Sequence, residues 1–510
     1  MLIDRSPVPH AVADPGYDAT LTSRERKRTG AWYTPHALVT HIVEQTISSH
    51  HRGAVVRVLD PACGDGRFLY EAGRVIRERG GIAELAGVDI DLGGLARSGG
   101  ADLIEAIQAD SLTYDWGERQ FDIVLGNPPF LSQMARATAR RSPSAFGGGP
   151  YADAAADFLA LALRLARPDG GRVGLVLPLS LLTARDAGPI RAGALQHAAL
   201  HWFWWSHAPV FDAMVRTCAV GLERRVAAPI TSTSTSVSAP ATPSANATPV
   251  DRITRTVGIA FQPIAALISN GFDTVNDHWG SLISDSLGMP AVPVLRADGC
   301  MSDRALVTAN FRDQYYGLVG AVGDHVDGPP LITTGLIDVA QCHWGTRPTR
   351  FAKQRFEAPR VDRLALAPFM QRWADRCLVP KVLVATQTHV LEAVVDESGA
   401  WLPAVPVIRV VPHDHDDVWA VAAVLTSPVA SAVIAEQSVG SGLSATTVRV
   451  SQRTLGALPW PAGTLIHAID ALRAGDVVQC GRLTDAAFGV FDDDLFEWWL
   501  KGVERQNSRR

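Results

Sequence analysis

From Arg57 to Glu223, short apolar runs alternate with stretches of helical spacing, which restricts this part of the chain to few folds. The runs VVRVLD (55–60), LAGVDI (85–90), FDIVLG (121–126) and GRVGLVLP (171–178) predict strands. Helical spacing runs from Phe68 to Arg79 and from Asp157 to Arg167. Continuous apolar strands separated by helices are typical of a mostly parallel sheet that is covered on both faces. We therefore expect an α/β, doubly wound domain.

A stretch without charge divides the chain. Residues 227–250, AAPITSTSTSVSAPATPSANATPV, consist mainly of Ser, Thr, Ala and Pro, a composition typical of a linker. With 510 residues, the chain has room for two or more cores. The predicted parts are an N-terminal tail (1–28), the α/β domain (29–226), the linker (227–250), a C-terminal α+β domain (251–463) and a helical tail (464–510).

Composition excludes several classes of protein. Apolar residues make up 47% of the chain, yet no run of eighteen or more apolar residues suggests a membrane span. The start, MLIDRSPVPH, lacks the layout of a secretory signal. The six cysteines are scattered and form no CxxC pair, and His413–Asp417 has no diagnostic ligand spacing. We expect a cytoplasmic protein without disulfides and without a metal site.

One segment departs from the net charge of −5. Between Gln341 and Lys381, nine Lys or Arg residues against three acidic ones leave a local charge of +6. The nine are Arg347, Arg350, Lys353, Arg355, Arg360, Arg363, Arg372, Arg376 and Lys381. Such a cluster is either a surface for nucleic-acid phosphates or a solvated loop.

The segment VLDPACGDGRFL (58–69) predicts a ligand-binding turn. A strand ends at Asp60, and a turn with Gly64 and Gly66 leads into a helix. Glycines let the backbone approach a ligand, and open α/β sheets bind ligands at the carboxyl ends of their strands. The chain has neither the GxGxxG pattern of dinucleotide-binding turns nor the GK[ST] of a phosphate loop.

Two further carboxylates follow later strands. In GVDID (87–91), Asp89 lies where it could accept hydrogen bonds from both ribose hydroxyls of an adenosine-containing cofactor. Asp110, after another short apolar run, could accept a bond from the adenine amine. Either residue could instead be a cap or turn carboxylate.

The tetrapeptide Asn127-Pro128-Pro129-Phe130 directly follows the strand FDIVLG. The two prolines make the turn rigid and remove two N–H donors, which leaves carbonyls without a local partner. The side-chain oxygen of Asn127 adds a second acceptor, and Phe130 offers a face for a planar substrate. Two fixed acceptors suit an NH2 group whose two protons both need partners.

Taken together, TGAWYTP (29–35), DPACGDGRFL (60–69), GVDID (87–91) and NPPF (127–130) resemble the adenine-specific DNA methyltransferases of restriction-modification and phage-defence systems, in their gamma motif order. The resemblance implies a Rossmann-like, S-adenosylmethionine-dependent methyltransferase domain followed by a target-recognition domain. It also implies methyl transfer to N6 of a flipped adenine in double-stranded DNA. The implied partners are that DNA and a restriction endonuclease or another defence-system subunit, with no membrane.

The resemblance also implies roles for individual residues. Those at the cofactor are Tyr33, Thr34, Pro35, Asp60, Ala62, Gly64, Asp89, Asp110 and Phe158. The catalytic set is Asn127, Pro128, Pro129 and Phe130, with Phe211 as a second aromatic contact to the target base. The basic cluster, and not the resemblance, gives the expected DNA contacts Arg347, Arg350, Lys353 and Arg355. Asp65 departs from the Ser that is common in the family, and Phe130 stands where Tyr is as frequent.

Other functions stay open at this point. Methyltransferases that act on RNA or on protein glutamine carry similar tetrapeptides, and a non-catalytic DNA-binding specificity subunit could retain the same fold. The aromatic run HWFWW (201–205) could stack bases, but a buried strand is the favoured interpretation.

Overall fold

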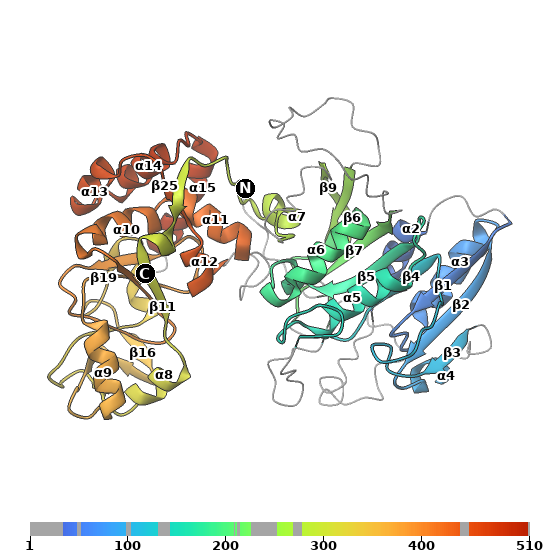
Figure 1. The fold of residues 1–510 in the computed structure, drawn as a ribbon, viewed down its shortest axis with the longest axis horizontal. Coiled ribbons are helices and arrows are strands. Elements are labelled where there is room, and N and C mark those ends of the chain that lie inside the picture. The colour runs from blue at the N-terminus through green and yellow to red at the C-terminus, as the bar shows by residue number, and fades with distance from the viewer. Residues whose placement is uncertain are drawn as a thin grey trace, which may run out of the picture. The chain divides into compact units, whose positions relative to one another are not determined.

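The computed structural model describes residues 34–47, 53–97, 104–130, 143–208, 210–211, 215–225, 252–268, 278–438 and 448–507. The chain divides into two compact units, residues 1–279 and 280–510 (Figure 1). The predicted N-terminal tail and the predicted linker at 227–250 lie outside the described residues, as does Tyr33.

The first unit is built on a 9-stranded sheet with the order β3-β2-β1-β4-β5-β7-β6-β8-β9. Its strands are β1 (Val55–Asp60), β2 (Ile82–Asp89), β3 (Glu105–Gln108), β4 (Ile123–Gly126), β5 (Arg172–Pro178), β6 (Ala198–Trp205), β7 (Thr217–Arg224), β8 (Arg252–Val257) and β9 (Gln262–Ile268). Neighbouring strands from β3 to β5 pair in parallel. Strand β7 runs antiparallel to both β5 and β6. This arrangement confirms the predicted α/β, Rossmann-like, mostly parallel fold.

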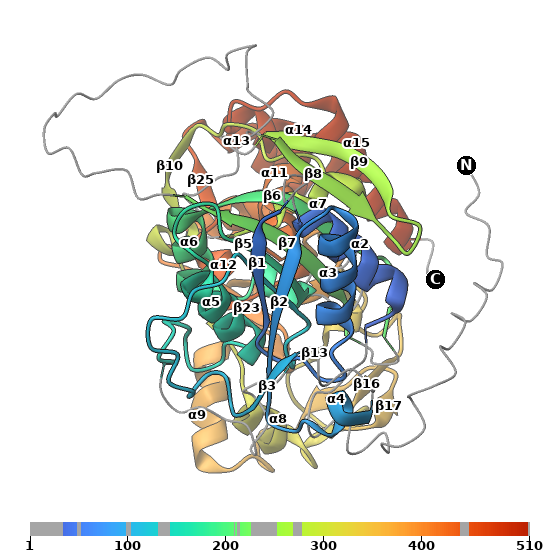
Figure 2. The same ribbon diagram turned by 90° about the vertical axis from the view of Figure 1, so that its right-hand side faces the viewer.

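Helices cover both faces of this sheet. Figure 2 shows α2 (His36–Thr46) and α3 (Arg67–Glu78) on one side, and α5 (Ala154–Leu165) and α6 (Gly188–His197) on the other. All four residues of β4 are buried, as are the last six of β5. Because helices cover both faces of the sheet, side chains on both sides of these strands are buried, and the strands are apolar without alternation.

The aromatic run at 201–205 belongs to the core. Trp202, Phe203, Trp204 and Trp205 are each at most 5% exposed along β6. The predicted buried strand is therefore confirmed, and these rings are closed to a base. The short helix α4 (Gly93–Arg97) follows β2 in the first unit, whereas α7 (Ser281–Ser284) belongs to the second unit.

The predicted domain boundary at residue 250 is wrong. Strand β8 pairs in parallel with β6 from Trp202 to Trp205, and β9 pairs antiparallel with β8. Residues 252–268 therefore extend the first sheet, and the division falls between Trp279 and Gly280. The composition of a segment can suggest a boundary between domains. The pairing of strands decides to which sheet the residues after that segment belong.

The second unit is an α+β structure around a 4-stranded sheet with the order β11-β23-β19-β21. Its strands are β11 (Ala305–Ala309), β19 (Lys381–Val384), β21 (Ala393–Asp396) and β23 (Ile408–Pro412). The helices are α8 (Arg312–Leu318), α9 (Pro368–Cys377), α10 (Val418–Leu425), α11 (Pro428–Ser438), α12 (Gln452–Gly456), α13 (Ile466–Arg473), α14 (Val477–Ala487) and α15 (Asp493–Asn507). Helices α13 and α14 pack on α10, so the predicted tail from 464 is part of this unit.

Two-stranded pairs complete the second unit. They are formed by β10 (Ala297–Cys300) with β25 (Pro459–Pro461), β12 (Val322–Gly323) with β18 (Arg360–Val361), β13 (Leu331–Ile332) with β22 (Leu402–Pro403), β14 (Ile337–Asp338) with β15 (Gln341–Cys342), β16 (Thr349–Phe351) with β17 (Gln354–Phe356), and β20 (Gln387–Thr388) with β24 (Val448–Arg449).

Within the described ranges, no single helix is both long and apolar enough to cross a membrane. The segments His415–Leu425 and Pro428–Ser438 pass that test only as a pair, and they are bent by 66° where they meet. Most side chains of α10 and α11 are buried within the second unit.

Lys381, the last residue of the basic segment, does not reach the surface. Its side chain and that of Asp396 are both 0% exposed and form an ion pair across β19 and β21. Asp396 also accepts hydrogen bonds from the N–H groups of Ala400 (3.0 Å) and Trp401 (2.9 Å). Lys381 is therefore a core residue, which corrects its place in the basic cluster.

Lys381→Met should destabilise the second unit by about 3–5 kcal/mol, because it leaves a buried carboxylate without its cation. The measurement is the urea midpoint of the full chain, followed by tryptophan fluorescence. Lys501→Met, at an ion-paired but 64% exposed lysine of α15, is the matched control and should shift stability by less than about 0.5 kcal/mol. Equal midpoints for the two variants would contradict the role of the buried pair.

Candidate cofactor and catalytic site

The predicted site residues of the first unit gather at one edge of its sheet. Strands β1, β2 and β4 are parallel neighbours, so their carboxyl ends meet at the same edge. Asp60 ends β1, Asp89 ends β2, and Asn127 follows the last residue of β4. The structure thereby brings together residues that lie up to 67 positions apart in sequence, the difference between 127 and 60.

Asp60 is buried at the centre of this edge. It is 1% exposed, and its Oδ1 accepts a hydrogen bond from the N–H of Ala62 at 2.9 Å. Burial, opposed by that bond and assisted by the charges of Asp89 and Asp65, raises the pKa of Asp60 to about 8. A buried carboxyl with such a pKa is suited to a cationic group of a ligand, which would favour its ionised form.

Gly126 lies between the carboxyl of Asp60 and the predicted catalytic tetrapeptide, which begins at Asn127. Its φ is +155°, and a Cβ at this position would lie 2.5 Å from Oδ1 of Asp60. Any larger residue would therefore collide with the carboxyl. The glycine lets β4 end directly against Asp60, and this fixes the start of the turn at Asn127.

The turn after β1 is held by the end of β2. Asp89 accepts hydrogen bonds from the N–H groups of Gly64 at 2.9 Å and Asp91 at 3.0 Å. Burial is the main cause that raises the pKa of Asp89, and those backbone bonds oppose it. A carboxylate offers about four acceptor positions, so Asp89 retains capacity for ribose hydroxyls. A Cβ on Gly64 would meet nothing within 4 Å, so its backbone borders open space.

Arg67 is a site residue that the motif analysis did not single out. It forms an ion pair with Asp65 (Nη2 to Oδ2, 2.6 Å), and it also donates to the carbonyl oxygen of Thr34. Thr34 is 2% exposed, and Pro35 directly precedes α2. Asp65, the departure from the common Ser, thus belongs to an Asp-Gly-Arg clamp that joins Thr34 and Pro35 to the turn. In the sequence, the only sign of this clamp was that the opposite charges of Asp65 and Arg67 stand two positions apart.

Asp110 begins the turn after β3. It is exposed, and its Oδ1 accepts a hydrogen bond from the N–H of Leu112 at 3.0 Å. Its neighbour Ser111 is buried and donates from Oγ to the carbonyl of Pro61 at 2.5 Å. The turn is therefore tied to the loop after β1, and Asp110 has the turn role considered above, while its contact with adenine stays a prediction.

The predicted catalytic tetrapeptide, Asn127-Pro128-Pro129-Phe130, lies at the boundary between core and solvent. Pro128 is buried, whereas Asn127, Pro129 and Phe130 are half-buried. The Oδ1 of Asn127 is shielded from solvent. The rings of Phe130 and Phe211 lie 6.5 Å apart in an edge-to-face arrangement, with an interplanar angle of 87°. Two rings at a right angle form two walls for a planar group.

Phe158 is 6% exposed on α5, which packs against β4 and β5. This position suits an ordinary core residue, and the predicted contact with the cofactor stays a prediction.

Among the described residues, no group of three His, Cys, Asp or Glu side chains is placed to hold a metal ion. The expectation that the site needs no metal likewise stays a prediction.

The four predicted DNA contacts belong to the second unit and differ in their surroundings. Arg350, Lys353 and Arg355 are exposed. Arg347 is half-buried and forms a salt bridge with Asp338 (Nη2 to Oδ2, 2.8 Å), which also contacts Nε2 of His343 at 2.7 Å. Arg347 therefore has a structural partner, and its predicted phosphate contact stays a prediction.

These features define a Rossmann-like domain whose sheet edge fits a cationic adenosine cofactor. The observations that support this fit are the buried Asp60, the open space beside Gly64 and the acceptor positions of Asp89. This is the arrangement of an S-adenosylmethionine-dependent methyltransferase domain.

Comparison with known proteins agrees. Residues 18–201 match the family model of the N-6 DNA methylases, which confirms the resemblance predicted from the motifs for this part of the chain. S-adenosylmethionine is accordingly the expected cofactor. The gamma motif order stays a prediction.

Individual relatives are more distant. Over 149 residues, the chain is 32% identical to the type II methyltransferase M.TthHB8I of Thermus thermophilus, which covers 27% of this chain and 32% of that protein. Thus only a minor part of that relative is matched.

Two solved structures are similar at low identity. One is a type I restriction-modification methyltransferase subunit from Streptococcus thermophilus, with 19% identity, 49% of this chain, 51% of that chain and a TM-score of 0.34. The other is the type IIG restriction endonuclease BpuSI, with 10% identity, 95% and 66% coverage, and a TM-score of 0.40.

Binding of S-adenosylmethionine should release a proton from Asp60. A pKa of about 8 keeps this carboxyl protonated below that pH, whereas a cationic ligand favours the carboxylate. Release on binding means that affinity rises with pH, here between about pH 6 and 7.5. Calorimetry in two buffers of different ionisation enthalpy measures the protons released. Asp60→Asn should bind without release. Unchanged release in this variant would assign the proton to another group, with Asp89 the first candidate.

Asp89→Ala should weaken cofactor binding by about tenfold to a hundredfold, because it removes acceptors for the ribose hydroxyls. It also removes the bond to Gly64, so the melting temperature should fall in the absence of cofactor. Asp110→Ala, at an exposed turn carboxylate, should lower affinity without a comparable loss of stability. A cofactor dissociation constant unchanged in Asp89→Ala would make Asp89 a purely structural residue.

Proposed function

We propose that this protein transfers the methyl group of S-adenosylmethionine to N6 of adenine in double-stranded DNA. The observation that carries the proposal is the position of Asn127-Pro128-Pro129-Phe130. This tetrapeptide directly follows β4, next to the buried Asp60, with the ring of Phe211 at a right angle to that of Phe130. The family match over residues 18–201 supports both the cofactor and the nucleobase amine as its substrate.

When bound, S-adenosylmethionine supplies the activated methyl group. The chain's own contribution is mainly positioning. The side-chain oxygen of Asn127 and the carbonyl of Pro128 accept the two protons of the adenine amine. This draws the nitrogen lone pair out of conjugation with the ring. Phe130 stacks on the base and Phe211 bounds it from the side, so that a flipped adenine is held between two aromatic walls.

At the cofactor, we assign Asp60, Ala62 and Gly64 to the methionine end, together with Tyr33, Thr34 and Pro35. Asp89 is assigned to the ribose, Asp110 to the adenine, and Phe158 to the wall beside the cofactor. The Arg67 clamp positions Thr34 and Pro35 relative to the turn that holds Gly64.

The second unit is proposed to bind the target DNA through exposed basic residues. Restriction-modification is the expected setting, with an endonuclease or another subunit of the system as partner, and the cytoplasm is where this DNA would be met. Methylation-sensitive sequencing of DNA from a host that expresses the chain tests the activity and identifies the methylated sequence.

Asn127→Ala should abolish methyl transfer while cofactor affinity stays within about twofold, because the variant removes an acceptor for the substrate amine. Phe130→Ala should slow transfer by about tenfold to a hundredfold through the loss of stacking, and Phe130→Tyr, the matched control, should stay active. Tritium transfer to DNA and calorimetry with the cofactor are the measurements. An Asn127→Ala variant that keeps most of its activity would refute the assignment of the catalytic tetrapeptide.

A further inference from the structure

The strands β16 and β17 form a short two-stranded ribbon in the second unit, Thr349–Phe356. Residues Phe351 (5% exposed) and Phe356 (8% exposed) are turned inward. They belong to the same core cluster as Leu318 of α8 and Met370 and Trp373 of α9. Because side chains alternate along a strand, Arg350 and Arg355 occupy the opposite, outer face.

These two arginines lie directly opposite each other. They are Cα partners in the antiparallel register, and both are exposed. Cross-strand neighbours have Cβ atoms about 5 Å apart, and like charges in that position destabilise a sheet. Among the described residues, the one ionic contact on this face joins Arg355 to Glu357 at 3.3 Å, between side chains that are 64% and 69% exposed. Such a water-exposed pair contributes little, so the repulsion is largely uncompensated within the described part of the unit.

The turn at the tip of the ribbon is also unfavourable by itself. Ala352 and Lys353 have φ values of +48° and +66°, in the left-handed region that favours glycine or asparagine. This two-residue turn is a short connection between β16 and β17. It places the exposed Lys353 at the outermost point, between the two arginines in sequence.

The base of the ribbon, in contrast, is firmly held. On the entry side, Arg347 binds Asp338 and the carbonyl of Gly335 (3.0 Å). On the exit side, Asp324 accepts hydrogen bonds from the N–H groups of Glu357 (3.0 Å) and Ala358 (2.8 Å). Because both ends are anchored, the outer face is presented as a rigid surface.

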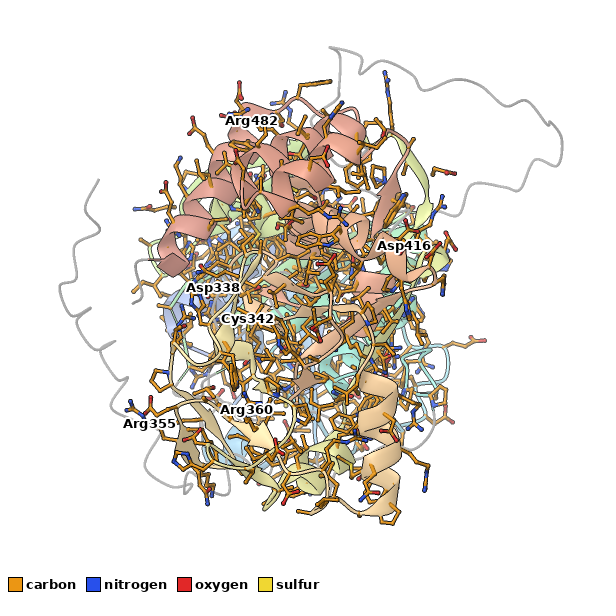
Figure 3. The ribbon with its side chains drawn as sticks, turned by 90° about the vertical axis from the view of Figure 1, so that its left-hand side faces the viewer. Asp338, Cys342, Arg355, Arg360, Asp416 and Arg482 are labelled. Carbon is orange, nitrogen blue, oxygen red and sulfur yellow. The ribbon has the colours of Figure 1, made fainter. Side chains whose placement is uncertain are left out.

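A second contact joins the two ends of the ribbon. The indole N–H of Trp344 donates to the carbonyl of Pro359 at 2.8 Å, and the guanidinium of Arg360 lies 4.7 Å from the centre of the Trp344 ring. Figure 3 labels Arg355 at the left margin of the view, with Arg360 further in and Asp338 above both. A rigid base and a charged, repulsive outer face are what an element that inserts into a polyanion needs.

We propose that the β16–β17 ribbon enters the major groove of duplex DNA, where Arg350 and Arg355 each bind a guanine of the recognition sequence and Lys353 binds a phosphate. This inference rests on the proposed function. The major groove is about 12 Å wide and admits a two-stranded ribbon, and arginine pairs bidentately with O6 and N7 of guanine. The deep, narrow major groove of RNA helices would exclude the ribbon.

The two roles predict different responses to conservative substitution. Arg350→Lys and Arg355→Lys keep the charge but lose the bidentate fork, so each should relax the preference for guanine at one position, and the two positions should differ. Discrimination against a duplex with that guanine replaced should fall by about tenfold to a hundredfold. Lys353→Ala should leave the preferred sequence unchanged and reduce the slope of log affinity against log salt by about 0.9.

The experiment is selection of bound duplexes from a random library by the full chain with S-adenosylmethionine, followed by affinity titrations on the enriched sequence. The matched control is Arg473→Lys with Lys501→Arg, at side chains that are 53% and 64% exposed in α13 and α15. This control should keep the preferred sequence and its affinity. Melting temperature and cofactor affinity, measured for every variant, identify any loss of folding.

The ribbon and the proposed function can fail separately. If the wild-type chain enriches a sequence but methylates no DNA, the proposed function fails, and the arginine variants still decide the ribbon's role on that sequence. The ribbon inference is overturned if no sequence is enriched, if the arginine variants keep every guanine preference of the wild type, or if a structured RNA competes better than the selected duplex.

Discussion

The contact between the buried carboxyl of Asp60 and the backbone of Gly126 is the constraint on which the rest of the site depends. It sets the end of β1 against the end of β4 at the closest approach that a residue without Cβ permits. The turn after β1, which borders the expected cofactor site, and the turn after β4, which is proposed to offer two acceptors to an amine, are thereby fixed relative to each other. Transfer of a methyl group between two bound molecules requires this kind of rigid spacing.

A second set of contacts completes the cofactor edge. Asp89 holds the N–H of Gly64, Ser111 holds the carbonyl of Pro61, and Arg67 joins Thr34 to the same turn. The end of β2, the loop after β3 and the segment before α2 therefore converge on the loop after β1. Each contact uses a polar side chain, and that of Ser111 is buried. These bonds together hold the loop after β1 in place.

The second unit separates charge that supports the fold from charge that is available to a ligand. Lys381 and Arg347 both lie in the basic segment, yet one is fully buried against Asp396 and the other is bound to Asp338. Arg350 and Arg355 remain on the outer face of a ribbon, opposed only weakly by Glu357. A net charge of −5 for the whole chain is therefore compatible with a local surface for DNA, because binding depends on which charges are free.

The sequence by itself determined strands β1, β2, β4 and β5 of the first unit and the Asn-Pro-Pro-Phe turn after β4, because apolar runs and proline-fixed turns act over a few neighbouring residues. The buried strand at 201–205 was predicted for the same reason. Only the tertiary structure decided that β8 and β9 extend that sheet, because strand pairing joins residues far apart in the chain. It also decided the roles of Arg67, Arg347 and Lys381. A charged residue looks the same in a sequence whether it faces water or a buried carboxylate, and the partner across the fold makes the difference.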